Sequence, residues 1–241
     1  MSTGGKVERL PDMSPRFLAR MAGVCQLLEA ITATFGQVIV LGRLTVSGNA
    51  AATAANIVGH ERLYWLGFGS SILAVLLHVA WAFLMYELLK PVNRRVSLFA
   101  LFVMLMGCAM LAVTGLLYVA PLLILQGGAS LSAFTAAQLQ ALAAAFLQLN
   151  AYAFDMHVVF FGVWCVLTGY LIFKSSFLPK ILGILLIVAG SGWMLYLSPP
   201  FAAHLFSFIA AASAIGELPI ELWLIVVGVN EARWKEQTNV D

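Results

Sequence analysis

Charged residues are scarce in this 241-residue chain. Asp, Glu, Lys and Arg together make up only 10% of it, whereas apolar residues make up 62%. A soluble globular domain has roughly 25% charged and 45–50% apolar residues. The mean hydropathy of +0.95 is therefore that of a chain that folds in lipid. The net charge of +2 is too small to indicate a nucleic acid as partner.

Cysteine pairs and the common catalytic motifs are also lacking. Cys25, Cys108 and Cys165 are an odd number without C-x-x-C spacing, so they indicate apolar packing rather than disulfides or a thiolate metal site. The segment from His60 to Tyr64 begins like a zinc-protease motif but lacks its second His, and no Gly-rich phosphate loop occurs. We therefore expect no cofactor and no bound metal.

Long apolar runs, in contrast, are abundant. A membrane-spanning helix needs about 20 mostly apolar residues, and six stretches of the chain qualify. The first begins with Ser14-Pro15, a favourable cap followed by Pro at the first helical position. The sequence predicts an all-α polytopic membrane bundle of six transmembrane helices, near residues 17–41, 63–89, 96–125, 155–173, 181–197 and 206–229.

The basic residues predict how this bundle is oriented. With the N-terminus inside the cell, eleven Lys and Arg residues fall in cytoplasmic segments and only Arg43 and Arg62 fall outside. We therefore expect a multi-pass protein of the inner (plasma) membrane with both termini in the cytoplasm. Its expected parts are a cytoplasmic N-terminal segment (1–16), the six-helix domain (17–230) and a charged, frayed cytoplasmic tail (231–241).

Two outer connections have helical patterns of their own. Residues 50–62 are rich in Ala and mildly amphipathic, which predicts a short helix along the outer surface. Residues 135–150 contain strong helix formers and no charge, and Thr135 can cap them. We expect this stretch to extend the fourth span outward as one long helix.

Several stretches resemble a known family. They are AAATAANIVGHERLYWLGF (50–68), LMYELLKPVNRR (84–95), most of residues 139–186 and, more weakly, GELPIELWLIVVGVN (216–230). Together they resemble a bacterial family of multi-pass membrane proteins, the domain-of-unknown-function family 4386. The resemblance implies six spans and no established activity.

Ionisable residues within membrane spans are costly and usually face the bundle interior. Counted from the basic residue at the inner end of each span, Glu29, His78 and Glu221 lie roughly 14–18 Å deep at a rise of 1.5 Å per residue. Each shares a helical face with small residues, a pattern typical of helix contacts in lipid. We expect the first, second and sixth spans to be mutual neighbours that place these three side chains in one pocket, as candidate catalytic residues. Pro219 should kink the sixth span and turn Glu217, a fourth candidate, toward the pocket entry, or into the place of Glu221 beside Glu29.

Candidate substrate-binding residues lie around this set. Gln26 shares a seam with Glu29 on the first span. Asp155 and His157 differ by two residues, about 200° around a helix, so they cannot both face one pocket. Asp155, aligned with Tyr152 and with glycines, has the better inward face, and His157 is expected in a solvated position at the headgroup level.

The polar set is compatible with more than one function. We favour a pocket that binds or acts on an apolar molecule, such as a lipid or isoprenoid, with a buried Glu kept protonated as general acid. One alternative is a small proton-coupled transporter or exporter that uses the same groups as a relay. Others are a non-enzymatic accessory protein and a polar set that only holds helices together. The expected partners are membrane lipid and a small apolar ligand.

Overall fold

The computed structural model of the protein describes residues 14–238, and these form helices and connections without a strand. Six helical segments are long and apolar enough to cross a membrane, so the predicted six-span, all-α architecture is confirmed. Of the predicted N-terminal segment (1–16), residues 1–13 lie outside the described residues, as do residues 239–241 of the tail. The six segments are α1 with its continuations (Pro15–Leu44), α4 (Glu61–Leu89), α5 (Arg94–Gln126), α6 (Ala136–Lys174), α7 with a short 3-10 turn (Lys180–Leu197) and α9 (Phe206–Val226).

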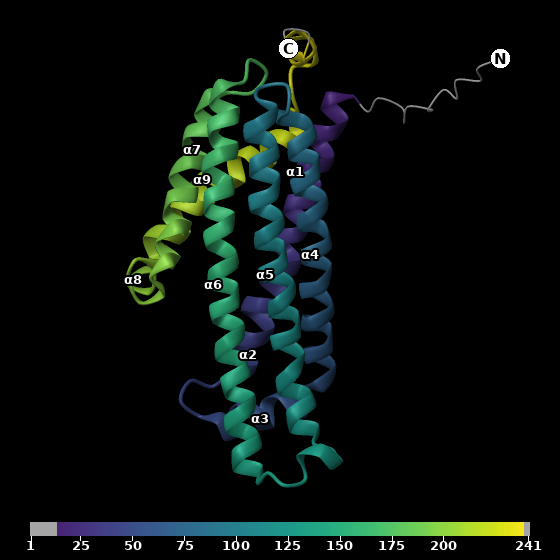
Figure 1. Ribbon diagram of the computed structural model, residues 1–241, viewed down its shortest axis with the longest axis vertical. Helices are drawn as coiled ribbons and strands as arrows, with labels where there is room; N and C mark the ends of the chain where they lie inside the picture. The colour runs from purple at the N-terminus through teal and green to yellow at the C-terminus, as the bar shows by residue number, and fades with distance from the viewer. Residues whose placement is uncertain (1–13, 239–241) are drawn as a thin grey trace, which may run out of the picture.

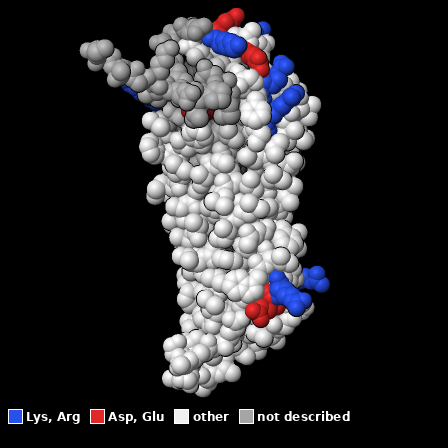
Figure 2. Space-filling view, turned by 90° about the vertical axis from the view of Figure 1, so that its right-hand side faces the viewer, with Lys and Arg blue, Asp and Glu red and all other residues white. Residues whose placement is uncertain are grey.

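The six helices form a ring in which each packs against the next. The order is α1, α4, α5, α6, α7 and α9, and α9 closes the ring against α1. The start of α1 and the C-terminal helix α10 (Glu231–Thr238) lie at the same end of the bundle (Figure 1). We call this the basic end and the opposite one the far end. Figure 2 shows an uncharged band between the charges at the basic end and a smaller charged group toward the far end.

The predicted helix starts are confirmed. The Ser14 hydroxyl accepts a hydrogen bond from Phe17 N at 3.2 Å, and Pro15 occupies the first helical position of α1. Thr135 forms a capping box with Gln138 at the start of α6, in which each side chain satisfies a backbone N–H of the other residue. As predicted, the stretch after Thr135 and the fourth span are one continuous helix of 39 residues.

The far end is built differently from the basic end. After α1 (Pro15–Ala33), the helix continues as a π-helical stretch, η1 (Thr34–Val40), and a last turn, α2 (Leu41–Leu44). The predicted surface helix is α3 (Ala50–Gly59), which packs against α6. The hairpin of α7 and α9, joined by the short α8 (Pro199–His204), ends well before the far ends of α4, α5 and α6 (Figure 1). The far part of α6 is therefore not covered by α7.

The tail is ordered over its described residues, so the predicted fraying is wrong there. Trp234 of α10 donates its indole N–H to the carbonyl oxygen of Leu88 at 2.9 Å. Arg233 donates to the carbonyl oxygen of Ser176 at 3.3 Å. A partly buried aromatic side chain, whose indole N–H is hydrogen-bonded, anchors the helix, although the charged composition of the tail alone suggested a solvated segment.

Two glycines let α6 and α7 approach backbone to backbone. A Cβ added at Gly162 would lie 2.6 Å from Gly190 O, and one added at Gly190 would lie 2.5 Å from Gly162 O. In lipid, helices associate largely through packing, because the tails around them are as apolar as the side chains. The close approach of these two helices therefore depends on both glycines.

Replacing Gly162 by Ala is expected to lower the free energy of unfolding by about 1–3 kcal/mol, because the new methyl group forces α6 and α7 apart. Unfolding of the purified protein in mixed micelles, followed by circular dichroism, measures this loss. Gly69→Ala is the matched control, since a Cβ at Gly69 meets no atom within 4 Å. Equal unfolding midpoints for the two variants would contradict the packing argument.

Candidate functional site

A carboxyl and an imidazole meet inside the bundle. Glu29 of α1 places its Oε1 atom 3.1 Å from Nδ1 of His78 on α4. The His78 side chain is 2% exposed and that of Glu29 is 13% exposed. The two atoms are at ion-pair distance, but the ring is not aligned for a hydrogen bond to this oxygen. The other ring nitrogen of His78, Nε2, lies 3.0 Å from Sδ of Met104 on α5.

His157 lies beside this pair, so the predicted solvated position is wrong. Its side chain is buried, and Nδ1 lies 2.9 Å from Gly107 O on α5. The rings of His157 and His78 are 5.2 Å apart, edge to face. His157 is buried because two faces of α6 are in contact with other helices. The glycines of α6 face α7, as Gly162 shows, while the repeat of Asn150, His157 and Trp164 is buried on the side of α5.

Glu221 of α9 is buried and Glu217 is partly buried, and among the described residues no hydrogen bond or ion pair joins either of them to Glu29 or His78. Glu221 is 3% exposed, and its Oε2 atom has no hydrogen-bond partner. Glu217 accepts hydrogen bonds from Trp193 Nε1 at 2.6 Å and from Ser213 Oγ at 2.8 Å. The structure brings only Glu29 and His78 to contact distance, so the pocket that these two would share with Glu221 stays a prediction. The expectation that α1, α4 and α9 are mutual neighbours is wrong in one respect, because α1 lies between α4 and α9 in the ring.

Within the described residues, the carboxyl groups of this interior have no Lys or Arg partner. Among residues 14–238, no Lys or Arg nitrogen lies within 4.0 Å of a carboxylate oxygen of Glu29, Glu217 or Glu221. The same part of the chain contains no group of three His, Cys, Asp or Glu residues that could hold a metal ion.

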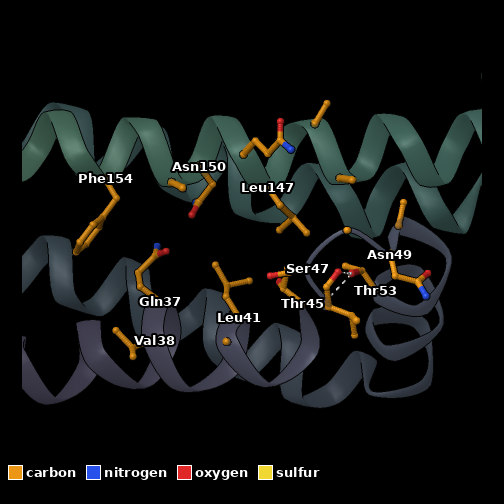
Figure 3. Close-up of a pocket in the computed structure, with 18 of the residues that line it drawn as sticks. Gln37, Val38, Leu41, Thr45, Ser47, Asn49, Thr53, Leu147, Asn150 and Phe154 are labelled. Atoms are coloured by element: carbon orange, nitrogen blue, oxygen red, sulfur yellow. Dashed lines mark hydrogen bonds between the residues drawn. The ribbon is translucent and has the colours of Figure 1, made fainter. Parts of the chain in front are cut away.

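A separate pocket opens at the far end, in the flank that the short α7–α9 hairpin leaves uncovered. Its volume is about 840 Å³. One wall is η1 with α2, another is the connection from Thr45 into α3, and the third is the far part of α6 (Figure 3). Ala144, Gln148, Ala151 and Asp155 recur at intervals of three and four residues, so they line one face of α6.

The polar groups of this pocket are amides, hydroxyls and one carboxyl, with no cation among them. The amide nitrogen of Asn150 donates to Thr114 O at 2.8 Å, and that of Gln37 donates to Thr114 Oγ1 at 3.4 Å. Each amide therefore leaves its oxygen for the pocket (Figure 3). Asp155 is the one ionisable group among the described lining residues, and no Lys or Arg lines the pocket.

The predicted substrate-binding residues separate into distinct places. Asp155 lines the far-end pocket. Tyr152 is 59% exposed and is not among the residues that line the pocket, and Gln26 is buried about one turn from Glu29 toward the basic end. His157 and the pocket are connected through Phe154, which lines the pocket and whose ring lies 5.9 Å from that of His157.

Sequence reasoning missed Gln37, Asn150 and Phe154. Asn150 is a polar residue in a long uncharged helix, and its position one heptad before His157 was a usable signal for an inward face. Gln37 lies in the π-helical stretch. Nothing in the apolar pattern reveals such a change of hydrogen-bond register, although π-helical turns are frequent at functional sites.

Comparison with known proteins places this geometry in a family. A family model described as a domain of unknown function (DUF4386) matches residues 21–228. An uncharacterized protein of Archaeoglobus fulgidus is 31% identical over 74 residues, which are 31% of this chain and 45% of that protein. The chain thus matches less than half the length of this curated relative. No solved structure matches the chain.

Proposed function

Starting from the fact that this chain belongs to the family described as domain of unknown function 4386, we propose that it binds a membrane amphiphile in the far-end pocket. One observation carries the proposal: an 840 Å³ pocket with mainly apolar walls opens on the flank of a six-span bundle. Pockets for small ligands usually have about 300–1,000 Å³ and a few placed polar groups. This pocket fits that description.

The lining favours a particular class of amphiphile. Side chains such as Val38, Leu41 and Leu147 suit a long isoprenoid or acyl chain. The amide oxygens of Gln37 and Asn150 and the carboxylate of Asp155 accept hydrogen bonds, so they suit a polar end that donates them, such as a hydroxyl or an amine. A phosphate head is disfavoured, because it would meet a carboxylate and no Lys or Arg.

Binding, rather than acid catalysis, is what the geometry supports. The buried acid expected to act on the ligand was Glu29 or Glu221, and neither is among the residues that line the pocket. Asp155, the lining carboxyl, lies on an open flank rather than in a dry interior. The proposed activity is therefore to hold or present a lipid-like molecule at the far end of the bundle.

Filling the pocket should remove this activity. In Ala144→Trp the indole occupies the space beside Leu147 and Gln148, and we expect it to reduce the amount of co-purified amphiphile at least about tenfold, the equivalent of 1.4 kcal/mol. Lipid extraction of the protein purified in mild detergent, followed by mass spectrometry, measures the amount. Leu149→Trp is the matched control, because Leu149 is on the same helix but is 51% exposed outside the pocket.

Two results would overturn the proposal. One is a wild-type protein that retains no amphiphile after mild extraction. The other is an Ala144→Trp variant that folds like Leu149→Trp and retains the same molecules in the same amounts.

We further propose that the protein lies in the inner (plasma) membrane with its basic end in the cytoplasm. The support is the excess of Lys and Arg at that end, including Lys90, Arg94 and Lys174, since positively charged segments stay on the cytoplasmic side. A reporter that fluoresces only in the cytoplasm, fused to the C-terminus, is expected to be bright. The same reporter inserted after Gly127, at the far end, is expected to be dark, and the reverse pattern would refute this orientation.

A further inference from the structure

The hydrogen-bond chemistry of His78 defines where its protons are. The thioether sulfur of Met104 can accept a weak hydrogen bond but cannot donate one. The 3.0 Å contact of His78 Nε2 with this sulfur therefore places a hydrogen on Nε2. In a neutral ring with that tautomer, Nδ1 carries a lone pair and is an acceptor.

This acceptor faces a second acceptor. Nδ1 lies 3.1 Å from Oε1 of Glu29, and an ionised carboxylate also has only lone pairs to offer. Two unprotonated acceptors at this distance repel each other, and burial leaves no bulk water to separate them. The contact is favourable only when one more proton lies between the two atoms, either on the carboxyl or on the imidazole.

We propose that Glu29 and His78 form a proton-binding site inside the membrane, which holds one exchangeable proton on either Oε1 or Nδ1. When the carboxyl group turns into line with the ring, the proton moves by breaking the O–H bond of the carboxylic acid and forming an N–H bond on the imidazole. The products are a carboxylate and an imidazolium, and no other bond changes. In either form the pair is neutral overall.

The surroundings of the pair support a neutral site. The titratable groups in the interior around it include Cys25 on α1, Cys108 on α5, His157 and Cys165 on α6, and Glu217 and Glu221 on α9, whereas the Lys and Arg residues of these helices lie near the helix ends. None of these interior groups is a Lys or Arg that could balance a net negative charge on the pair. An uncompensated charge within a membrane span costs about 2.5–3.5 kcal/mol even on the scales that rate it lowest.

The interior is also incompletely satisfied by the protein itself. His78 Nδ1 and the indole nitrogen of Trp81 are buried without a hydrogen-bond partner, and their rings are 5.0 Å apart. Buried polar atoms are almost always paired in a purely structural cluster.

His157 is the next group on the path from this site toward the far-end pocket. Its Nδ1 atom must donate to Gly107 O at 2.9 Å, because a carbonyl oxygen only accepts. In the neutral ring Nε2 is then an unprotonated acceptor, and the ring lies 5.2 Å from that of His78. Phe154 separates His157 from the pocket. The proton site uses none of the pocket residues, so it and the proposed ligand binding can fail independently.

Two spectroscopic readouts on the full chain in lipid nanodiscs count the protons. Nitrogen NMR with labelled histidine reports which nitrogens of His78 are protonated, and infrared spectroscopy reports the carbonyl stretch of a protonated Glu29. We expect His78 Nε2 to be protonated, and either an imidazolium signal from His78 or an acid carbonyl band from Glu29 that shifts in heavy water. The proposal is overturned if Glu29 is ionised beside a neutral His78, or if the extra proton does not exchange with heavy water.

Matched variants identify the source of the signals. Glu29→Gln keeps the shape and offers an amide N–H to Nδ1, so it is expected to abolish both the acid band and the imidazolium signal. Glu87→Gln, which changes a surface carboxyl bonded to Lys90 at 2.6 Å, is expected to leave both unchanged. Loss of the signals in Glu87→Gln, or their persistence in Glu29→Gln, overturns the assignment. The wild-type measurement decides the question even if Glu29→Gln does not fold.

Discussion

Replacing Glu29 by Ala is expected to lower the free energy of unfolding by about 3–5 kcal/mol, the cost of removing one partner of a buried pair. The methyl group removes the carboxyl that lies 3.1 Å from Nδ1 of His78, a side chain that is only 2% exposed. The loss is measured by unfolding in mixed micelles, with wild type and variant in the same detergent.

Two controls test whether the loss of stability is specific to the pair of Glu29 and His78 or follows the removal of any carboxyl group. Glu29→Gln should cost much less than Glu29→Ala, because its amide can still reach the ring of His78. Glu87→Ala should cost at most about 1 kcal/mol, because its ion pair with Lys90 is partly exposed to solvent. If Glu29→Ala were no less stable than Glu87→Ala, the pair would not be a stabilising feature of the interior.

Trp164→Ala should have an effect of similar size for a different reason. Trp164 of α6 is 2% exposed, and its ring lies 4.5 Å from that of Trp81 on α4 and stacks on Phe161 at 6.1 Å. Removing it leaves a cavity where three aromatic rings meet, and a substitution of this kind costs about 3–5 kcal/mol. Within a membrane the lost free energy comes mainly from packing contacts, because the hydrophobic effect does not drive helices together in lipid.

The control for Trp164→Ala is Trp65→Ala. Trp65 is 40% exposed and donates a hydrogen bond only to Glu61 on its own helix, at 3.2 Å. Its removal is expected to cost less than about 1 kcal/mol, as for most surface substitutions. Comparable unfolding midpoints for Trp164→Ala and Trp65→Ala would show that the aromatic cluster is not the packing centre of the bundle.

The membrane spans could be predicted from the sequence because they depend on local quantities. Apolar length determines whether a segment can cross a bilayer, so the second span, expected at 63–89, is observed as Glu61–Leu89. Caps are equally local, and the start of α6 follows from Thr135 and Gln138. None of these inferences requires knowledge of which helix lies next to which.

The site was harder to predict because it depends on the order of helices around the ring. The depth estimate brought Glu29 and His78 together, and the structure pairs them through adjacent helices α1 and α4. The same estimate placed Glu221 with them, but α9 lies on the other side of α1. Glu217 is held by the indole of Trp193, a partner on a third helix that no pattern within α9 reveals.

His157 shows a second limit of single-helix patterns. The glycines at positions 162 and 169 were a correct sign of a helix contact, and this contact is with α7. Each helix in the ring has a neighbour on both sides. Helix α6 therefore also buries a second face, which carries His157 and packs against α5. Far-end features such as η1 and the pocket depend on helix lengths compared across the whole bundle, as with α6 and the short α7–α9 hairpin.

Photoaffinity labelling in membranes tests the central claim most directly, because it reports where an amphiphile sits rather than how much is retained. The probe is a long-chain isoprenoid alcohol with a photoreactive diazirine in its chain, and peptide mass spectrometry maps the adducts. We predict adducts concentrated on residues 37–53 and 141–155, which contain the pocket lining. Ala144→Trp should strongly reduce the number of these adducts, whereas Leu149→Trp should not. Adducts spread evenly over the lipid-facing surfaces of α4, α5 and α9, and unaffected by Ala144→Trp, would contradict it.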